Sequence, residues 1–174
     1  MQVSSIIAFD LGASSGRALL GRLNGGAIEV EELHRFPNDP VQVGDRLYWD
    51  ILRLYHEIKQ GLLKAKHRGV TLDSIGIDSW AVDFGFIGRS GELLANPYHY
   101  RDRHTEGALE SLMSRVPANV IFGRTGIQFL PFNTIFQLFA LKMAHSPLLQ
   151  EGSRLLMIPD LLRYFLTGQL HNEF

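Results

Sequence analysis

The sequence IIAFDLGASSGR, residues 6–17, joins two apolar runs through a turn of small residues. The first run ends in Asp10, and the second begins at Ala18. This order predicts a strand, a tight turn and a second strand. One carboxylate then lies beside a turn whose backbone N–H groups and hydroxyls can face an anion. We therefore expect the turn to hold phosphate groups and a metal ion.

The turn differs from the two common phosphate-binding loops. A Walker loop needs G-x-x-x-x-G-K-[ST] before a helix, and the dinucleotide motif G-x-G-x-x-G also opens a helix. Here the turn has no lysine and leads into a strand. An ordinary hairpin turn is the alternative, because Gly and Ser between apolar runs often form one. Against this alternative, Ser14, Ser15 and Arg17 surround a turn that already has two glycines, and an arginine can donate two hydrogen bonds to one phosphoryl group.

The composition limits the classes of function. The chain has 174 residues, 45% of them hydrophobic and 20% charged, with a formal net charge of -1. These values indicate a globular domain with one sizeable core and argue against a basic nucleic-acid binder. There is no cysteine, which excludes disulfides and thiolate metal sites, and the seven histidines lack the spacing of a zinc site. The sequence shows no signal sequence and no apolar span of membrane length, so we expect a cytoplasmic protein without a membrane partner.

The first half of the chain predicts three antiparallel strands, a helix and two further strands. The predicted strands cover residues 5–9, 17–23, 27–36, 72–77 and 82–87, and the helix covers residues 49–66. A hairpin turn is expected at Asn24, Gly25 and Gly26. The helix is expected to be capped near Asp50 and to end around Gly69. Residues 37–45, which contain two prolines and a glycine, are expected to form a polar loop.

From Thr105 onward the pattern becomes helical. Helices are predicted at residues 106–116, 119–122, 134–144 and 159–166, with Gly168 as the last stop. No repeat, low-complexity tract or linker divides the sequence. We expect an α/β protein whose mixed sheet begins with an antiparallel strand meander and carries helical insertions. This order suits a ribonuclease H-like lobe of the actin and hexokinase type of ATPase.

Five motifs occur in an order that one family shares. They are IAFDLGASSGR at residues 7–17, IGIDSWAVDFG at 75–85, YRDRHT at 100–105, RTGIQFLPFNT at 124–134 and MIPDLLRYFLTG at 157–168. With them, the chain resembles the N-terminal lobe of the FGGY carbohydrate kinases, from about residue 6 to residue 174. Within that family, the wording of the first, second and fourth motifs favours a kinase of L-rhamnulose.

The resemblance implies ATP-dependent phosphorylation of L-rhamnulose at its terminal hydroxyl. The product would be L-rhamnulose 1-phosphate, in the breakdown of L-rhamnose. The resemblance also implies that Asp10 helps to position Mg²⁺ through water, and that the ATP phosphates contact Ala13, Ser14, Ser15, Gly16 and Arg17. Phosphoryl transfer depends mainly on positioning and charge neutralisation, which a backbone cradle, an arginine and a magnesium ion supply.

The resemblance further implies that the ketose contacts the loop formed by residues 78–83. Ala81 occupies the position that touches substrate, where many relatives carry glycine, and a backbone contact would survive that change. Trp80 offers an apolar face to a deoxy sugar, and Asp83 could accept hydrogen bonds from its hydroxyls. The alternatives are that Trp80 is a core aromatic residue and that Asp83 is a strand-end or cap residue.

Two later segments supply the remaining candidates. The resemblance places Arg101 and Asp102 near the sugar cleft, although alternating charges there also fit a surface ion-pair cluster. Phe132 and Asn133 match a position where relatives have an aromatic residue near the substrate. Asp160 is interpreted as the first-turn acid of a helix, where the helix dipole stabilises it.

The sequence also departs from the family. In the family the aspartate that deprotonates the sugar hydroxyl comes after the position of Phe174, and a C-terminal nucleotide-binding lobe follows it. We therefore expect residues 1–174 to be a truncated N-terminal lobe, without a catalytic base and inactive alone. Two alternatives stay open, namely a related deoxyketose kinase that acts on L-fuculose, and a non-catalytic sugar- or nucleotide-binding module.

Overall fold

The computed structural model describes residues 4–172, which form two compact units. Unit 1 comprises the described residues up to Pro40, Asp50–Ala81 and those from Ile158 onward. Unit 2 comprises Val41–Trp49 and Val82–Met157. Each unit is assembled from segments that are far apart along the chain. No linker in the sequence therefore marks the boundary between the two units. No helix within residues 4–172 is long and apolar enough to cross a membrane.

Unit 1 is built on a four-stranded mixed sheet with the order β3-β2-β1-β6. The strands are β1 (Ser4–Leu11), β2 (Ser15–Asn24), β3 (Ala27–Pro37) and β6 (Ser74–Ser79). The first three are antiparallel, as the sequence predicts, and β6 runs parallel to β1. Gly25 and Gly26 form the predicted hairpin turn with φ angles of 58° and 89°, which glycine adopts without strain.

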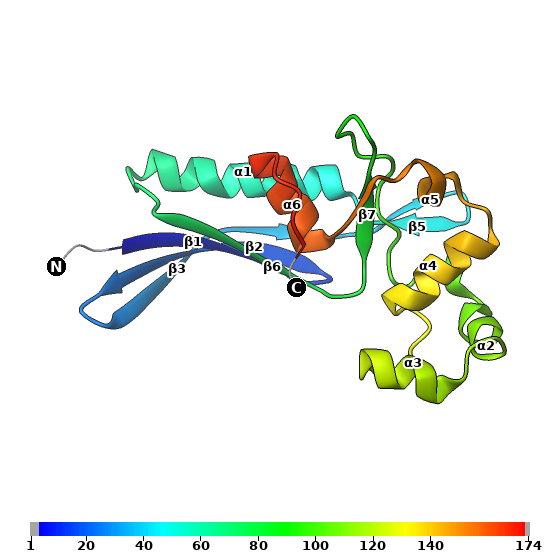
Figure 1. Ribbon diagram of the computed structural model, residues 1–174. Helices are drawn as coiled ribbons and strands as arrows, with labels where there is room; N and C mark the ends of the chain where they lie inside the picture. Colours follow the sequence, from blue (N-terminus) through cyan, green and yellow to red (C-terminus); the bar gives the residue numbers. More distant parts are fainter. Residues whose placement is uncertain (1–3, 173–174) are drawn as a thin grey trace. The chain divides into compact units, whose positions relative to one another are not determined.

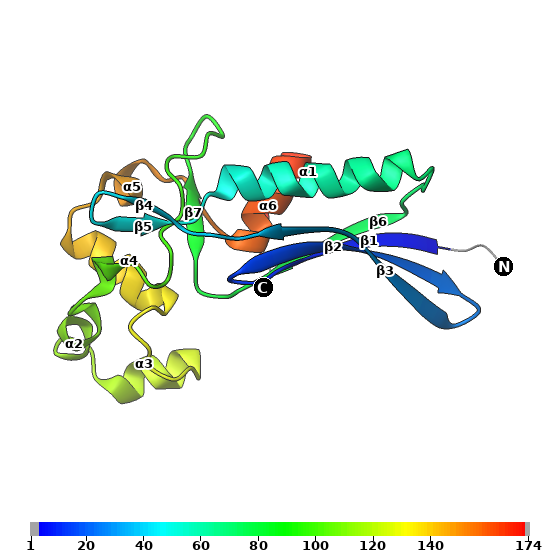
Figure 2. The ribbon, with the colours of Figure 1, turned by 180° about the vertical axis from the view of Figure 1, so that it is seen from behind.

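Helix α1 (Ile51–His67) and helix α6 (Ile158–Thr167) lie together on one face of this sheet (Figures 1 and 2). The predicted cap of α1 is confirmed, because the Asp50 side chain accepts a hydrogen bond from the backbone N–H of Arg53 at 3.1 Å. The side chains of Ile7, Phe9 and Leu11 are buried on the helical face. The alternation of a strand therefore puts Asp10 on the opposite face.

Unit 2 consists of two small antiparallel sheets and several short helices. The strands pair as β4 (Val41–Val43) with β5 (Arg46–Tyr48), and β7 (Phe84–Ile87) with β8 (Arg154–Met157). The helices are η1 (Arg103–Thr105), α2 (Ala108–Met113), α3 (Ala118–Thr125), α4 (Thr134–Met143) and α5 (Pro147–Glu151). A core of Phe84, Phe86 and Leu141 holds β7 against α4 and the neighbouring segments.

The structure corrects the sequence analysis in unit 2. The polar loop predicted at residues 37–45 includes β4, whose three residues pair with β5. The strand predicted at 82–87 is observed as β7, which pairs with β8 in a sheet separate from that of unit 1. Neither β8 nor α5 was predicted. These elements are three to five residues long, too short for a periodic pattern to reveal them.

Candidate functional site

The turn between β1 and β2 is held in shape by backbone hydrogen bonds and by one side chain from outside it. The N–H of Gly12 donates to the carbonyl of Ser15 at 2.9 Å. Asn38, which is 3% exposed, donates through its side chain to the carbonyl of Gly12 at 2.8 Å and through its backbone to that of Ser14 at 3.0 Å. Three carbonyls are thereby engaged, while Ala13 and Ser14 stay exposed at the tip. The turn is thus preformed, and its tip is accessible from solvent.

Gly16 is required by packing at the base of this turn. A Cβ at Gly16 would lie 2.4 Å from the ring of Phe36, which is 3% exposed. At Gly12, a Cβ would lie 3.1 Å from the carbonyl oxygen of Ser15. Both glycines therefore allow a tight approach that a larger residue would obstruct.

Charged side chains form a row across the sheet next to the turn. The strand registers align Arg35, Arg17, Asp10 and Asp78 on β3, β2, β1 and β6. Arg17 donates from Nε and Nη2 to Oδ2 of Asp10 at 2.8 and 2.6 Å. The two side chains are 44% and 42% exposed, so both remain accessible from solvent.

The row fits the groups that the sequence analysis assigned to it. Both hydrogen bonds from Arg17 reach the same oxygen of Asp10, and the other carboxylate oxygen has no hydrogen-bond partner among residues 4–172. A carboxylate oxygen is a ligand that Mg²⁺ accepts, directly or through water. The exposed Arg17 can bind a phosphate in place of, or together with, its carboxylate partner. The chemistry of the turn and the row is therefore suited to a magnesium–phosphate group.

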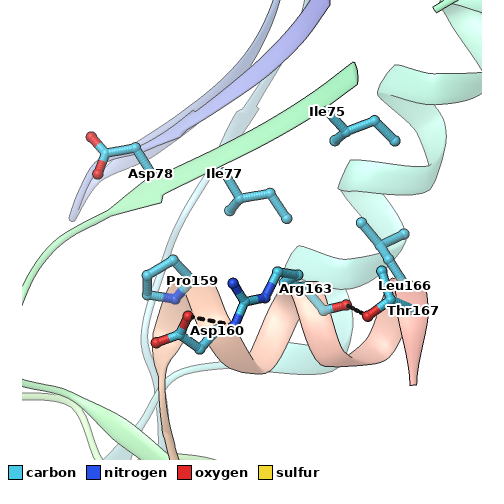
Figure 3. A pocket seen from close by; sticks show the side chains of 8 residues that line it. All are labelled: Ile75, Ile77, Asp78, Pro159, Asp160, Arg163, Leu166 and Thr167. Atoms are coloured by element: carbon cyan, nitrogen blue, oxygen red, sulfur yellow. Dashed lines mark hydrogen bonds and ion pairs between the residues drawn. The ribbon is translucent and has the colours of Figure 1, made fainter. Parts of the chain in front are cut away.

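A cavity of about 770 Å³ lies between β6 and α6 (Figure 3). Ile75 and Ile77 point toward α6, whereas Asp78 points away from it. Asp160 lies in the first turn of α6, as predicted, and forms an ion pair with Arg163, whose Nη2 is 3.1 Å from Oδ1 of Asp160. Asp78 is the one residue of the predicted ketose segment 78–83 that lines this cavity, and none of the individually named cofactor or substrate residues does.

In unit 2, a buried polar cluster forms around Asp83, directly before β7. We call Trp49, Asp83, Tyr100 and Gln137 the Asp83 cluster. One carboxylate oxygen of Asp83 accepts from Nε1 of Trp49 at 2.6 Å and from the backbone N–H of Tyr100 at 3.2 Å. The other oxygen accepts from Nε2 of Gln137 at 2.9 Å. Asp83 and Trp49 are both 0% exposed, so protein donors hold this carboxylate inside unit 2.

Tyr100 connects this cluster to two other predicted residues. The ring of Phe132 meets the ring of Tyr100 edge to face at 5.8 Å. The guanidinium of Arg101 lies over the same ring, 5.4 Å from its centre. Unit 2 thus brings Asp83, Arg101 and Phe132 together through one tyrosine, whereas Trp80 and Ala81 belong to unit 1.

The charged triplet 101–103 is not a surface ion-pair cluster. Asp102 is 5% exposed and accepts from the backbone N–H groups of Leu47 and His104 at 2.5 and 2.8 Å. Arg103 forms its own exposed pair with Glu106. Asp102 is therefore a buried residue that ties β5 to η1, whereas the guanidinium of Arg101 lies over the ring of Tyr100.

His99 packs against the rings of Trp49 and Tyr100 and is 4% exposed. Its ring centre lies 4.0 Å from that of Trp49, and its Nδ1 accepts from the backbone N–H of Arg101 at 3.0 Å. Burial, together with the charge of Arg101, lowers the pKa of His99 from 6.5 to about 4. The imidazole is consequently neutral at physiological pH.

Four residues that shape these sites were not predicted from the sequence: Asn38, Trp49, Tyr100 and Gln137. For three of them, no local signal distinguishes the residue from its neighbours. Gln137 is different, because it is a polar residue on the buried side of α4 beside Phe136. A buried amide in an apolar helix face must find hydrogen-bond partners, which is a signal that could have been used.

Comparison with known proteins identifies the family. Residues 5–174 match the FGGY family of carbohydrate kinases, N-terminal domain. The chain is 46% identical to a rhamnulokinase of Bacteroides thetaiotaomicron over 98% of its own length and 35% of that protein. It is 41% identical to a rhamnulokinase of Oceanobacillus iheyensis over 97% of its length and 36% of that protein. The chain thus spans about a third of the length of these relatives.

Solved structures confirm the predicted fold class. A gluconate kinase from Lactobacillus acidophilus superposes with a TM-score of 0.83 at 19% identity, over 97% of this chain and 34% of that one. A xylulose kinase from the same organism gives a TM-score of 0.82 at 20% identity, over 96% and 34%. The α/β lobe with a mixed sheet that the sequence predicts is therefore the fold of sugar kinases. Since the family match covers nearly the whole sequence, the chain belongs to the N-terminal domain of the FGGY family of carbohydrate kinases.

Proposed function

We propose that the full-length protein is a rhamnulokinase, which transfers the γ-phosphate of ATP to the terminal hydroxyl of L-rhamnulose. The observation that carries this proposal is the 46% identity to a rhamnulokinase over 98% of this chain. The product is L-rhamnulose 1-phosphate, within the breakdown of L-rhamnose. A cytoplasmic location agrees with this activity and stays a prediction.

The turn after β1 is assigned to the nucleotide. The backbone and hydroxyls from Ala13 to Gly16, with the guanidinium of Arg17, hold the phosphates, and Asp10 holds Mg²⁺ through water. The support is the preformed turn, which Asn38 fixes, and the accessible pair of Asp10 and Arg17. When bound, Mg²⁺ neutralises charge on the phosphates. Arg17 adds a second positive charge at the same place and orients the phosphates by directed hydrogen bonds.

Five residues are assigned to the ketose: Trp80, Ala81, Asp83, Arg101 and Phe132. Their tasks differ, because Ala81 and Arg101 are exposed while Asp83 is fully buried. Ala81 and Trp80 offer a backbone contact and an apolar face, and Arg101 donates hydrogen bonds to hydroxyls. Asp83, which already accepts three hydrogen bonds, orients its neighbours instead of contacting the sugar in this arrangement.

The 174-residue chain by itself is proposed to be inactive. Transfer requires a base within hydrogen-bond reach of the attacking hydroxyl. The two carboxylates assigned to the sites are already engaged, Asp10 by Arg17 and Asp83 by buried donors. The C-terminal lobe that completes the relatives is assigned the base and the remaining nucleotide contacts.

The test is ADP release by the full-length protein with Mg-ATP and a panel of L-rhamnulose, L-fuculose, D-xylulose and glycerol. We expect the highest kcat/KM with L-rhamnulose. Asp10→Asn should abolish most turnover. The matched control is Asp73→Asn, which changes an exposed carboxylate directly before β6, at the end of that strand away from Asp10. Preference for L-fuculose would replace the substrate and keep the chemistry. Turnover with none of the four would contradict the kinase and favour a non-catalytic binding module.

A further inference from the structure

Gln137 is a buried side chain in α4 to which the proposed reaction has so far given no task. It is 2% exposed. Its Nε2 lies 2.9 Å from the carbonyl of Phe132, 2.9 Å from Oδ1 of Asp83 and 3.3 Å from the carbonyl of Val82. Three acceptor oxygens around one atom require the amide nitrogen there, because only the nitrogen donates. The orientation of the amide is thus set by its surroundings.

The three acceptors belong to segments that carry predicted ketose contacts. Asp83 and Phe132 are themselves candidates, and Val82 directly follows Ala81 in the chain. The segments are far apart in sequence, since Gln137 and Asp83 are separated by 54 positions. One amide therefore fixes the spacing between the residue after Ala81 and the backbone of Phe132.

Val82 has a backbone conformation that needs such support. Its φ is 73°, in the left-handed region that a β-branched residue rarely adopts. The carbonyl of Val82 also accepts from Oγ1 of Thr134 at 2.8 Å. A strained conformation persists only where its surroundings over-determine it, and such residues concentrate at functional sites. Thr134 and Gln137, one turn apart on α4, hold Val82 in this conformation through their hydrogen bonds to its carbonyl.

We propose that Gln137 is a positioning residue for the ketose, acting through the left-handed backbone of Val82 and the carboxylate of Asp83. This inference rests on the proposed function, because it assigns the residue to the same sugar site. Gln137 does not touch the ketose. It holds the backbone of Val82 and the carboxylate of Asp83 in register with the backbone that carries Phe132.

The first test is steady-state kinetics of the full-length protein carrying Gln137→Met. Methionine keeps the volume and removes both donors. We expect the KM for L-rhamnulose to rise about tenfold or more, because small displacements in a substrate site have large kinetic effects. The KM for ATP should stay within about twofold of wild type. Gln150→Met, an exposed glutamine on α5, is the matched control and should change neither constant. A Gln137→Met protein that is folded and has an unchanged KM for the ketose would overturn the proposal.

The second test addresses the route through Val82. Glycine adopts a positive φ without strain. Adding Val82→Gly to the Gln137→Met protein should therefore lower its raised KM for the ketose by about threefold or more. Val82→Gly in the wild-type background should raise the KM less than Gln137→Met does. Absence of any recovery in the double variant would overturn the route through Val82.

The wild type, the two single variants at residues 82 and 137 and the double variant together separate this inference from the proposed function. If the wild type phosphorylates no ketose, the proposed function fails, and urea denaturation then replaces kinetics as the readout. Coupling between residues 82 and 137 remains measurable, because Val82→Gly should raise the urea midpoint of unfolding more in the Gln137→Met protein than in the wild type. Equal effects in both backgrounds would show that Gln137 does not support the Val82 backbone.

Discussion

Two polar sites of this protein use an aspartate in opposite ways. At the turn after β1, Asp10 and Arg17 pair with each other while each stays more than 40% exposed. In the Asp83 cluster, the carboxylate is 0% exposed and accepts hydrogen bonds only from the protein. An exposed pair contributes little to stability and can exchange its partners for a ligand. A buried, saturated carboxylate cannot be released without cost, so it serves to fix other residues.

The largest effect is expected from removing the buried carboxylate. Asp83→Ala removes the carboxylate that accepts from the indole N–H of Trp49 and the backbone N–H of Tyr100, whereas the amide of Gln137 keeps the carbonyls of Val82 and Phe132 as acceptors. Each such orphaned donor costs about 1–3 kcal/mol, so we expect a loss of about 3 kcal/mol or more in the free energy of unfolding, measured by urea titration. Asp83→Asn keeps the shape and one acceptor oxygen and should lose less.

The control is an exposed carboxylate that also accepts a backbone hydrogen bond. Oδ2 of Asp73 accepts from the N–H of Ser5 at 2.7 Å. Asp73→Ala should cost only about 0.5–1.5 kcal/mol, since water replaces the carboxylate as acceptor. Similar losses for Asp73→Ala and Asp83→Ala would remove the distinction between the two sites.

The hairpin at the first site could be predicted from sequence because everything that defines it is local. The turn and the partners Asp10 and Arg17 lie within eight consecutive residues, the two strands adjoin that turn directly, and the register places Asp10 and Arg17 opposite each other. Alternation along β1 also places Asp10 on the face opposite the helices. Only Asn38, which fixes the turn from the end of β3, was beyond this reasoning, because nothing local links it to Gly12.

The Asp83 cluster could not be assembled from sequence because its members are distant along the chain. Trp49 and Asp83 are 34 positions apart, and Gln137 is 54 positions beyond Asp83. Asp83 was named as a sugar ligand or as a strand-end residue, and its burial before β7 was not foreseen. The short strands β4 and β8 were not predicted for a related reason, since their pairing depends on partners that tertiary contacts select.

An intermediate effect is expected from pH, and it again separates the buried site from the exposed one. The pKa of His99 is lowered to about 4 by burial and by Arg101, and that of His104 is also lowered by burial. Below the unfolded pKa of about 6.5, the unfolded chain binds protons that the folded chain excludes. The free energy of unfolding should therefore fall as pH decreases from 6.5 toward 4, and His99→Gln should reduce that fall.

Exposed carboxylates predict a different window. Hydrogen bonds from arginines lower the pKa values of Glu31 and Glu32 below 4.5, so their contribution is complete above that pH and is lost only below it. Urea titrations at closely spaced pH values will separate the two. A free energy of unfolding that is constant between pH 6.5 and 4.5 would contradict the neutral, buried state of His99.

The smallest effect on stability, combined with a large effect on binding, is expected at Arg17. Arg17→Ala removes an exposed ion pair and should lower the free energy of unfolding by less than about 1 kcal/mol. The same change removes the proposed phosphate ligand, so the Kd of Mg-ADP for the full-length protein, measured by calorimetry, should rise about tenfold. Arg35→Ala is the matched control, because Arg35 lies next to Arg17 in the charged row and pairs with Glu32. An equal rise in Kd for both variants would mean that general positive charge, and not the geometry of Arg17 beside the turn, attracts the nucleotide.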